Sequence, residues 1–114
     1  MRVKGGFKTR RRRNKVLKAA SGFYSSQSRC FTYATAAVDR ARAFQYRDRR
    51  VKKRTARNLW TVRINAAARL NGTTYSRLMF AFKNAGIELD RKILADLAVQ
   101  SPSGFSQLVS QVTN

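Results

Sequence analysis

Histidine is absent from this sequence of 114 residues, and cysteine occurs once, as Cys30. A lone cysteine forms no internal disulfide, and without histidine or a second thiol the chain cannot build a zinc site of the usual Cys and His type. The most common general base at neutral pH is missing too, and no Gly-x-x-x-x-Gly-Lys phosphate loop occurs. We therefore predict no enzymatic activity, no cofactor and no metal, with Cys30 as a small packing residue.

Acidic residues are also scarce. Five Asp and Glu stand against 25 Lys and Arg, which gives a formal net charge of +20. Such a charge destabilises a compact chain by self-repulsion unless a polyanion neutralises it. No apolar run approaches the roughly 20 residues that span a bilayer, and the charged first residues lack the apolar stretch of a signal peptide. We expect a cytoplasmic protein whose partner is a nucleic acid, with no membrane and no small-molecule substrate.

The positive charge is concentrated in the first half of the chain. Residues 1–59 hold 19 Lys and Arg against two acids, a net +17, whereas residues 60–114 hold 6 against three acids, a net +3. The basic half is expected to gain little from burying apolar surface, while the second half has a regular apolar pattern. We predict a basic extension over 1–58 and a small globular domain over 59–114.

The basic extension carries two helix signals. Residues 10–18 are mostly basic and are separated from the next segment by Gly22, which predicts a short helix. No Gly or Pro interrupts residues 23–71, so a long helix is predicted to end near Leu70, before Gly72. At 1.5 Å per residue this helix would be about 65 Å long, too long for a compact domain of about 55 residues. Its first residue is expected to be one of three serines, Ser25, Ser26 or Ser28.

Cations are expected on every side of the long helix between residues 47 and 57. A helix face that is merely solvated normally mixes charges of both signs. Here like charges also occur four residues apart, as in Arg49 with Lys53, and each such pair costs a few tenths of a kcal/mol. We expect phosphate groups to supply the missing negative charge.

The second half predicts three further helices that pack with the end of the long one. They are expected over 75–84, ended by Gly86; over 91–100, capped by Asp90; and from Pro102 onward. Their apolar residues recur at three- and four-residue spacings. The fold class is therefore all-α, a long basic N-terminal helical extension leading into a small C-terminal helical domain. The residues expected in its core are Leu59, Trp60, Val62, Ile64, Ala67, Leu70, Leu78, Met79, Phe82, Leu89, Leu94, Phe105, Leu108, Val109 and Val112.

Charge alone does not separate DNA binding from RNA binding. A basic zipper needs leucines seven apart, but Ala66 and Thr73 follow Leu59 at that spacing. A helix-turn-helix protein would not require four consecutive arginines at 10–13 together with an extended basic helix. A membrane-active peptide would need a strong apolar face on its basic stretches. The alternative kept open is a nucleoid-like DNA-binding architectural protein, which would use a bent-duplex surface and usually a dimer interface.

RNA fits the pattern better, because phosphates of packed RNA helices approach a basic helix from several sides. Aromatic residues interleaved with the basic ones would either stack on unpaired nucleotides or pack on their own helices, and the sequence supports both equally. These aromatic residues are Phe7, Phe23, Tyr24, Phe31, Tyr33, Phe44 and Tyr46.

The segment 46–69 carries a specific resemblance to a known family. Tyr-Arg-Asp-Arg-Arg at 46–50 is followed at 53–69 by Lys-Arg-Thr-Ala-Arg-Asn-Leu-Trp-Thr-Val-Arg-Ile-Asn-Ala-Ala-Ala-Arg. Together they resemble the signature of the bacterial-type ribosomal protein L20 family of the large subunit, and the resemblance covers essentially the whole chain. Two departures are Ser25, where the family often has glycine, and Val62, where it usually has a smaller residue. Further matches are residues 2–6, Tyr75-Ser76 after Asn71-Gly72, and residues 90–98.

The resemblance implies an early-binding assembly protein of the large ribosomal subunit. Its basic extension would penetrate the large ribosomal RNA, and its helical domain would recognise a helix junction. In some bacteria the family also represses translation of its own message. The implied partners are large-subunit ribosomal RNA and neighbouring large-subunit ribosomal proteins. The implied location is the ribosome of the bacterial cytoplasm, with an organellar ribosome as the alternative.

The family's RNA-binding residues can be carried over by position. We expect the extension to become fully helical as phosphates neutralise it. The expected RNA-binding residues of the basic stretches are Arg10, Arg11, Arg12, Arg13, Lys15, Lys18, Arg29, Arg47, Arg49, Arg50, Lys52, Lys53, Arg54 and Arg57. Those expected around the RNA junction are Trp60, Arg63, Asn65 and Arg69.

Overall fold

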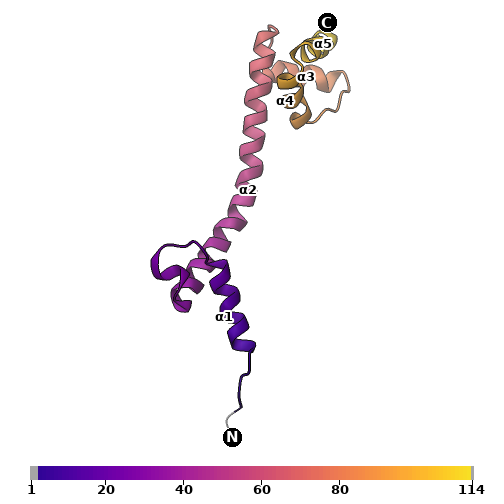
Figure 1. The fold of residues 1–114 in the computed structure, drawn as a ribbon. Helices are drawn as coiled ribbons and strands as arrows, with labels where there is room; N and C mark the ends of the chain where they lie inside the picture. Colours follow the sequence, from indigo (N-terminus) through magenta and orange to yellow (C-terminus); the bar gives the residue numbers. More distant parts are fainter. Residues whose placement is uncertain (1–2, 114) are drawn as a thin grey trace. The chain divides into compact units, whose positions relative to one another are not determined.

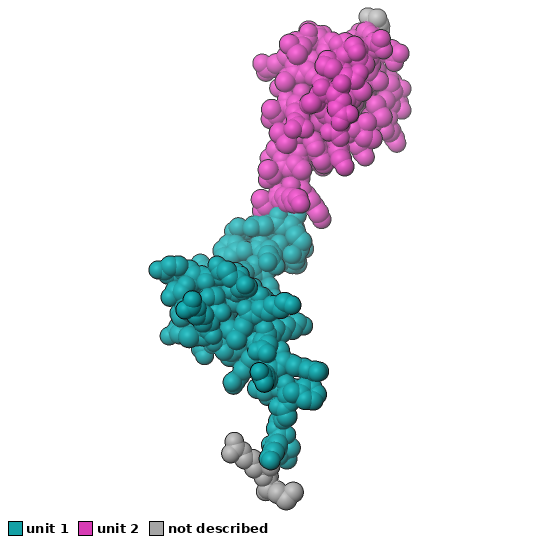
Figure 2. Space-filling view, in the orientation of Figure 1, with its two compact units in different colours: residues 1–50 teal, residues 51–114 magenta. Residues whose placement is uncertain are grey.

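The computed structural model describes residues 3–113, and within them it contains helices and no β-strand (Figure 1). The all-α class and the long helix are confirmed. The chain divides into two compact units, one up to Arg50 and one from Val51 (Figure 2). The division expected near Leu59 was based on charge and stays a prediction. The elements are α1 Lys8–Ala19, a 3₁₀ helix Ser25–Ser28, α2 Phe31–Leu70, α3 Tyr75–Asn84, α4 Arg91–Gln100 and α5 Pro102–Thr113.

The unit from Val51 is built around one apolar core to which four helices contribute. α5 packs against both α3 and α4, and the C-terminal part of α2 adds side chains to the same cluster. Full burial of each large side chain contributes about 1.5–3 kcal/mol. The apolar spacing predicted for α3, α4 and α5 is thus confirmed. The buried residues are Ile64, Ala68, Leu78, Phe82, Leu94, Ala95, Phe105 and Val109.

The face that α2 turns to this core differs from the predicted one. Trp60, Ile64 and Ala67 pack in or against the cluster as expected. Val62 is 64% exposed and Leu70 is 89% exposed, so the prediction that they belong to the core is wrong. Successive residues of a helix are about 100° apart, which turns Val62 about 200° away from Trp60. Leu59, also expected in the core, is 48% exposed and does not pack against the cluster, so this prediction is wrong as well.

Two glycines end the helices at the predicted places. Gly72 has φ 73° and its N–H donates to the Arg69 carbonyl at 3.1 Å, while the Thr73 N–H donates to the Ala68 carbonyl at 3.0 Å. These two bonds satisfy carbonyls that the end of α2 would otherwise leave unpaired. Gly86 has φ 67° and follows α3 in the same way. Glycine adopts this left-handed conformation without a steric cost, which explains both stops.

The starts of α4 and α5 also agree with the sequence signals. Asp90 is the N-cap residue of α4, and its carbonyl accepts the first helical bond from the Leu94 N–H at 3.0 Å, but its side chain makes no capping hydrogen bond. Leu89 packs against the cluster that contains Leu94, as expected for a hydrophobic staple. Pro102 is the first residue of α5, where its missing N–H costs nothing.

The unit up to Arg50 has a small core of its own. Ala20, Ala34 and Val38 are buried where the end of α1 meets the first turns of α2. Val16, Leu17 and Phe23 pack around them at partial exposure. The short helix predicted over the basic stretch is confirmed as α1. The sequence analysis expected this half to gain little from apolar burial and did not predict this cluster. The three buried residues are small and stand among many cations, so they give no clear apolar pattern.

Two predictions about the residues just before α2 are wrong: where the helix begins and whether Cys30 is packed. The helix begins at Phe31 instead of at one of the serines, because Ser25 has φ 55° and starts a 3₁₀ turn. The Cys30 N–H closes this turn on the Ser26 carbonyl at 2.8 Å, and the Cys30 carbonyl then accepts the first α2 bond from the Ala34 N–H. Cys30 itself is exposed, so it is not a packing residue.

Candidate nucleic-acid interface

The middle of α2 is exposed on all sides. Every residue from 42 to 55 is exposed, although a helix of a compact domain normally buries one stripe. Among residues 3–113 the one ion pair joins Arg47 Nη2 to Asp48 Oδ1 at 2.8 Å. The remaining cations of the stretch therefore carry uncompensated charge. In the first unit these are Arg42, Arg49 and Arg50, and at the start of the second they are Lys52, Lys53 and Arg54. Arg57 follows just beyond the stretch and is exposed as well.

The predicted cations of α1 are exposed as well, and some of them converge with a residue of the following turn. Arg10 and Arg13 line a cavity of about 490 Å³ together with Arg29 and Phe31. The Arg13 guanidinium lies 5.4 Å from the centre of the Phe31 ring. A guanidinium has a planar fork of N–H donors that matches a phosphate, so this cavity suits an RNA backbone. The other α1 cations that were predicted to bind RNA lie outside the cavity and are Arg11, Arg12, Lys15 and Lys18.

Several aromatic rings in the first unit are exposed and lie beside arginines of their own helix. Arg50 lies 3.7 Å from the centre of the Tyr46 ring and donates hydrogen bonds to the Tyr46 hydroxyl at 2.7 Å and carbonyl at 3.1 Å. Arg47 lies 4.6 Å from the Phe44 ring. Tyr24, with 87% exposure, is among the most exposed rings. The rings are thus solvent-accessible, and three of them, Phe7, Phe44 and Tyr46, already hold a guanidinium against one face.

The four residues expected at the RNA junction differ in their environments. Arg63 and Arg69 are exposed, whereas Trp60 and Asn65 are half-buried. Trp60 packs against the core of the second unit. The Asn65 side-chain oxygen accepts a hydrogen bond from the Tyr75 N–H at 3.3 Å, which ties α2 to the first residue of α3. Asn65 therefore has a structural partner that sequence reasoning did not reveal.

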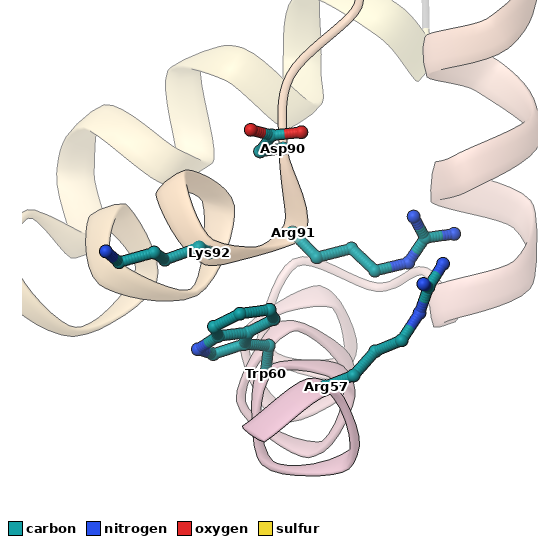
Figure 3. Close-up of a pocket in the computed structure, with 5 residues that line it drawn as sticks. All are labelled: Arg57, Trp60, Asp90, Arg91 and Lys92. Atoms are coloured by element: carbon teal, nitrogen blue, oxygen red, sulfur yellow. The ribbon is translucent and has the colours of Figure 1, made fainter. Parts of the chain in front are cut away.

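A second basic cavity lies within the unit from Val51. It has a volume of about 380 Å³, and Figure 3 shows the side chains that line it. The Arg91 Nε–H donates to the Tyr75 hydroxyl at 2.9 Å. Sequence reasoning missed Arg91 and Lys92 as site residues, although residues 90–98 are among the segments that resemble the family. The lining residues are Arg57, Trp60, Asp90, Arg91 and Lys92.

Two kinds of site are not found in the described part of the chain. Residues 3–113 contain no group of His, Cys, Asp and Glu side chains that could hold a metal ion. In the same range, no helix combines the length and the apolar character needed to cross a membrane.

Known proteins resemble this chain over nearly its whole length. The family model described as "Ribosomal protein L20" matches residues 2–108. A protein of Pelobacter propionicus called "Large ribosomal subunit protein bL20" is 60% identical over 107 residues, which are 94% of this chain and 92% of that protein. Proteins of the same name from Geobacter metallireducens and Anaeromyxobacter dehalogenans are also 60% identical over 109 residues, or 96% of this chain and 93% and 96% of their own lengths. The chain therefore belongs to the ribosomal protein L20 family, whose members are structural proteins without enzymatic activity.

Proposed function

We propose that this chain is a structural constituent of the large ribosomal subunit that binds large-subunit ribosomal RNA directly. The observation that carries the proposal is the exposed stretch of α2, whose cations other than Arg47 lack carboxylate partners among the described residues. The names of the relatives support a place in the large subunit. Since these relatives are bacterial, the location is the ribosome of the bacterial cytoplasm.

Phosphate neutralisation explains how α2 would bind. Each Lys or Arg that meets a phosphate releases condensed counterions, which favours binding at low salt and carries no sequence information. A helix with cations on all its faces can meet phosphates from several RNA segments at once. Selectivity for one RNA region would then come from the unit that begins at Val51, whose shape is fixed by its core.

The same geometry supports a role early in subunit assembly. RNA segments that contact opposite faces of one helix enclose it. The helix must therefore bind before these segments come together. The exposed apolar side chains of Val62 and Leu70 are available to neighbouring large-subunit proteins. If the chain also represses its own translation, as the family resemblance implies for some bacteria, the message would use these same RNA-binding surfaces.

A competition titration tests the proposal. The full chain is incubated with fragments of large-subunit ribosomal RNA, duplex DNA and an unrelated structured RNA, at salt rising from about 150 to 300 mM. We expect one ribosomal fragment to stay bound after the other complexes have dissociated. If all complexes dissociate together, the chain is a generic polycation and the DNA-architectural alternative gains support.

Single substitutions in the same titration test the role of α2. Lys53→Ala should make the slope of log K against log salt less steep by about one unit, because it removes one phosphate contact. Arg50→Ala should do the same. Lys83→Ala is the matched control, since Lys83 is an exposed cation of α3 outside the predicted interface. A slope unchanged by Lys53→Ala and Arg50→Ala contradicts the assignment of α2 to the RNA backbone.

A further inference from the structure

The cavity of about 380 Å³ in the second unit combines an aromatic ring with three cations. Arg57 and Trp60 come from α2, and Arg91 and Lys92 come from the first turn of α4. Its volume falls at the small end of the range for ligand pockets, about 300–1,000 Å³. Because all of these residues belong to one compact unit with a common core, the cavity has a defined shape.

Trp60 gives the cavity a surface on which a flat ring can stack. The side chain is half-buried and packs against the core, yet it also lines the cavity. A tryptophan needed only for the core would be covered by its neighbours. Here the accessible part of the indole is bordered by cations, a combination that proteins use to bind unpaired bases and their phosphates.

Arg91 is held in position by a hydrogen bond. Its Nε–H donates to the Tyr75 hydroxyl at 2.9 Å, which leaves the terminal guanidinium nitrogens available for another acceptor. Arg57 extends toward the same side of the cavity in Figure 3. Two guanidinium groups that approach each other repel unless an anion lies between them. Asp90 also lines the cavity, but it forms no ion pair with either arginine.

Lys92 extends to the other side of Trp60 in the same view (Figure 3). The cations thus flank the indole on two sides. A free nucleoside monophosphate has one phosphate and would engage one side only. A nucleotide within a strand has a phosphate before it and another after it, and so fits both sides.

We propose that this cavity binds one unpaired nucleotide of an RNA strand. The base stacks on Trp60, one phosphate binds Arg57 and Arg91, and the next phosphate binds Lys92. Tyr75 is a positioning residue that orients Arg91. The proposal rests on the proposed function, because it identifies the structural feature of the RNA that the helical unit recognises.

Trp60 is the one tryptophan of the chain, so its fluorescence reports on this cavity alone. The full chain is titrated with a short single-stranded adenosine oligonucleotide and, separately, with inorganic polyphosphate, which has the charge but no bases. We expect the oligonucleotide to quench Trp60 and polyphosphate to leave its emission nearly unchanged. Equal changes with both probes would overturn the proposal.

Substitutions identify the contribution of each side chain. Arg91→Gln should weaken oligonucleotide binding about tenfold, as expected for a lost charge-assisted hydrogen bond. Arg77→Gln is the matched control, because Arg77 is an exposed cation of α3 that does not line the cavity. Tyr75→Phe keeps the ring and should weaken binding about fivefold, with the midpoint of thermal unfolding monitored in parallel. If Arg91→Gln and Arg77→Gln have equal effects, the cavity is not the binding site.

The ribosomal fragment retained in the competition titration separates the two proposals. If this fragment binds selectively but Trp60 emission does not change, the cavity proposal fails while ribosomal RNA binding stands. If no ribosomal fragment is preferred over duplex DNA, the proposed function itself fails. Selective binding accompanied by Trp60 quenching supports both.

Discussion

Asn65 joins two helices at a point where α3 lacks a cap of its own. Thr74 occupies the N-cap position of α3, but its side chain makes no capping hydrogen bond. The Asn65 oxygen accepts the Tyr75 N–H instead, and so satisfies one of the donors that a helix start leaves unpaired. A residue of α2 thereby does what an N-cap side chain normally does within its own helix.

This arrangement predicts opposite results for two substitutions. Asn65→Ala should lower the free energy of unfolding by about 1 kcal/mol, because the half-buried N–H loses its acceptor. Asn65→Asp keeps an acceptor oxygen and places a negative charge near a helix N-terminus, so it should retain nearly all the stability. Urea unfolding of both variants measures the difference as a shift of the midpoint at constant m-value. Equal losses in both variants would mean that the hydrogen bond is not what Asn65 contributes.

Residue types determined which turns could be predicted. Gly72 and Gly86 were predicted as helix stops because glycine is the usual residue in the left-handed conformation. Ser25 adopts the same conformation, at φ 55°, at a cost of about 1 kcal/mol for a residue with a Cβ atom. Serine before an apolar periodic stretch normally indicates a helix start. The true start at Phe31 was therefore missed.

At the scale of the elements, a helix face was predictable where a single apolar stripe exists. α3 and α5 each have one such stripe, and the structure buries it. The end of α2 has apolar residues on more than one side, so spacing alone could not identify which side meets the core. The packing of α3, α4 and α5 decides it in favour of the side with Ile64 and Ala68.

Substitutions at Ile64 and Val62 test which face of α2 meets the core. Ile64→Ala should cost about 2–5 kcal/mol, because Ile64 is fully buried and its removal leaves a cavity. Val62→Ala should change the stability by no more than about 0.5 kcal/mol, since Val62 is exposed and alanine is the better helix former. Chemical unfolding monitored by circular dichroism compares the two. A loss at Val62 as large as that at Ile64 would show that Val62 is covered in the free protein.

The candidate site was predictable to a different extent in its two parts. The exposed cations of α1 and α2 could be predicted from composition, because so many cations without carboxylate partners cannot be buried in a small protein. The cavity around Trp60 could not, because it brings Arg57 together with residues of α4 that lie more than 30 positions later in the chain. Such a juxtaposition depends on how the helices pack, which the spacing within each helix does not specify.

At the scale of the whole molecule, the net charge of +20 makes the few acids informative. Asp48 lies within the most basic stretch and pairs with Arg47, at side-chain exposures of 56% and 62%. An ion pair this exposed stabilises the chain by no more than about 1 kcal/mol. It does, however, engage the Arg47 guanidinium, which would otherwise be available to a phosphate.

Removing the Asp48 charge should therefore strengthen RNA binding. Asp48→Asn leaves Arg47 without its carboxylate partner, so we expect higher affinity for ribosomal RNA at low salt. The slope of log K against log salt should become steeper by up to about one unit, the contribution of one added phosphate contact. Asp96→Asn is the control, because Asp96 is an exposed acid of α4 and its loss changes the net charge equally. A steeper slope in Asp48→Asn alone assigns Arg47 to the RNA backbone, whereas equal changes in both variants would mean that only the total charge matters.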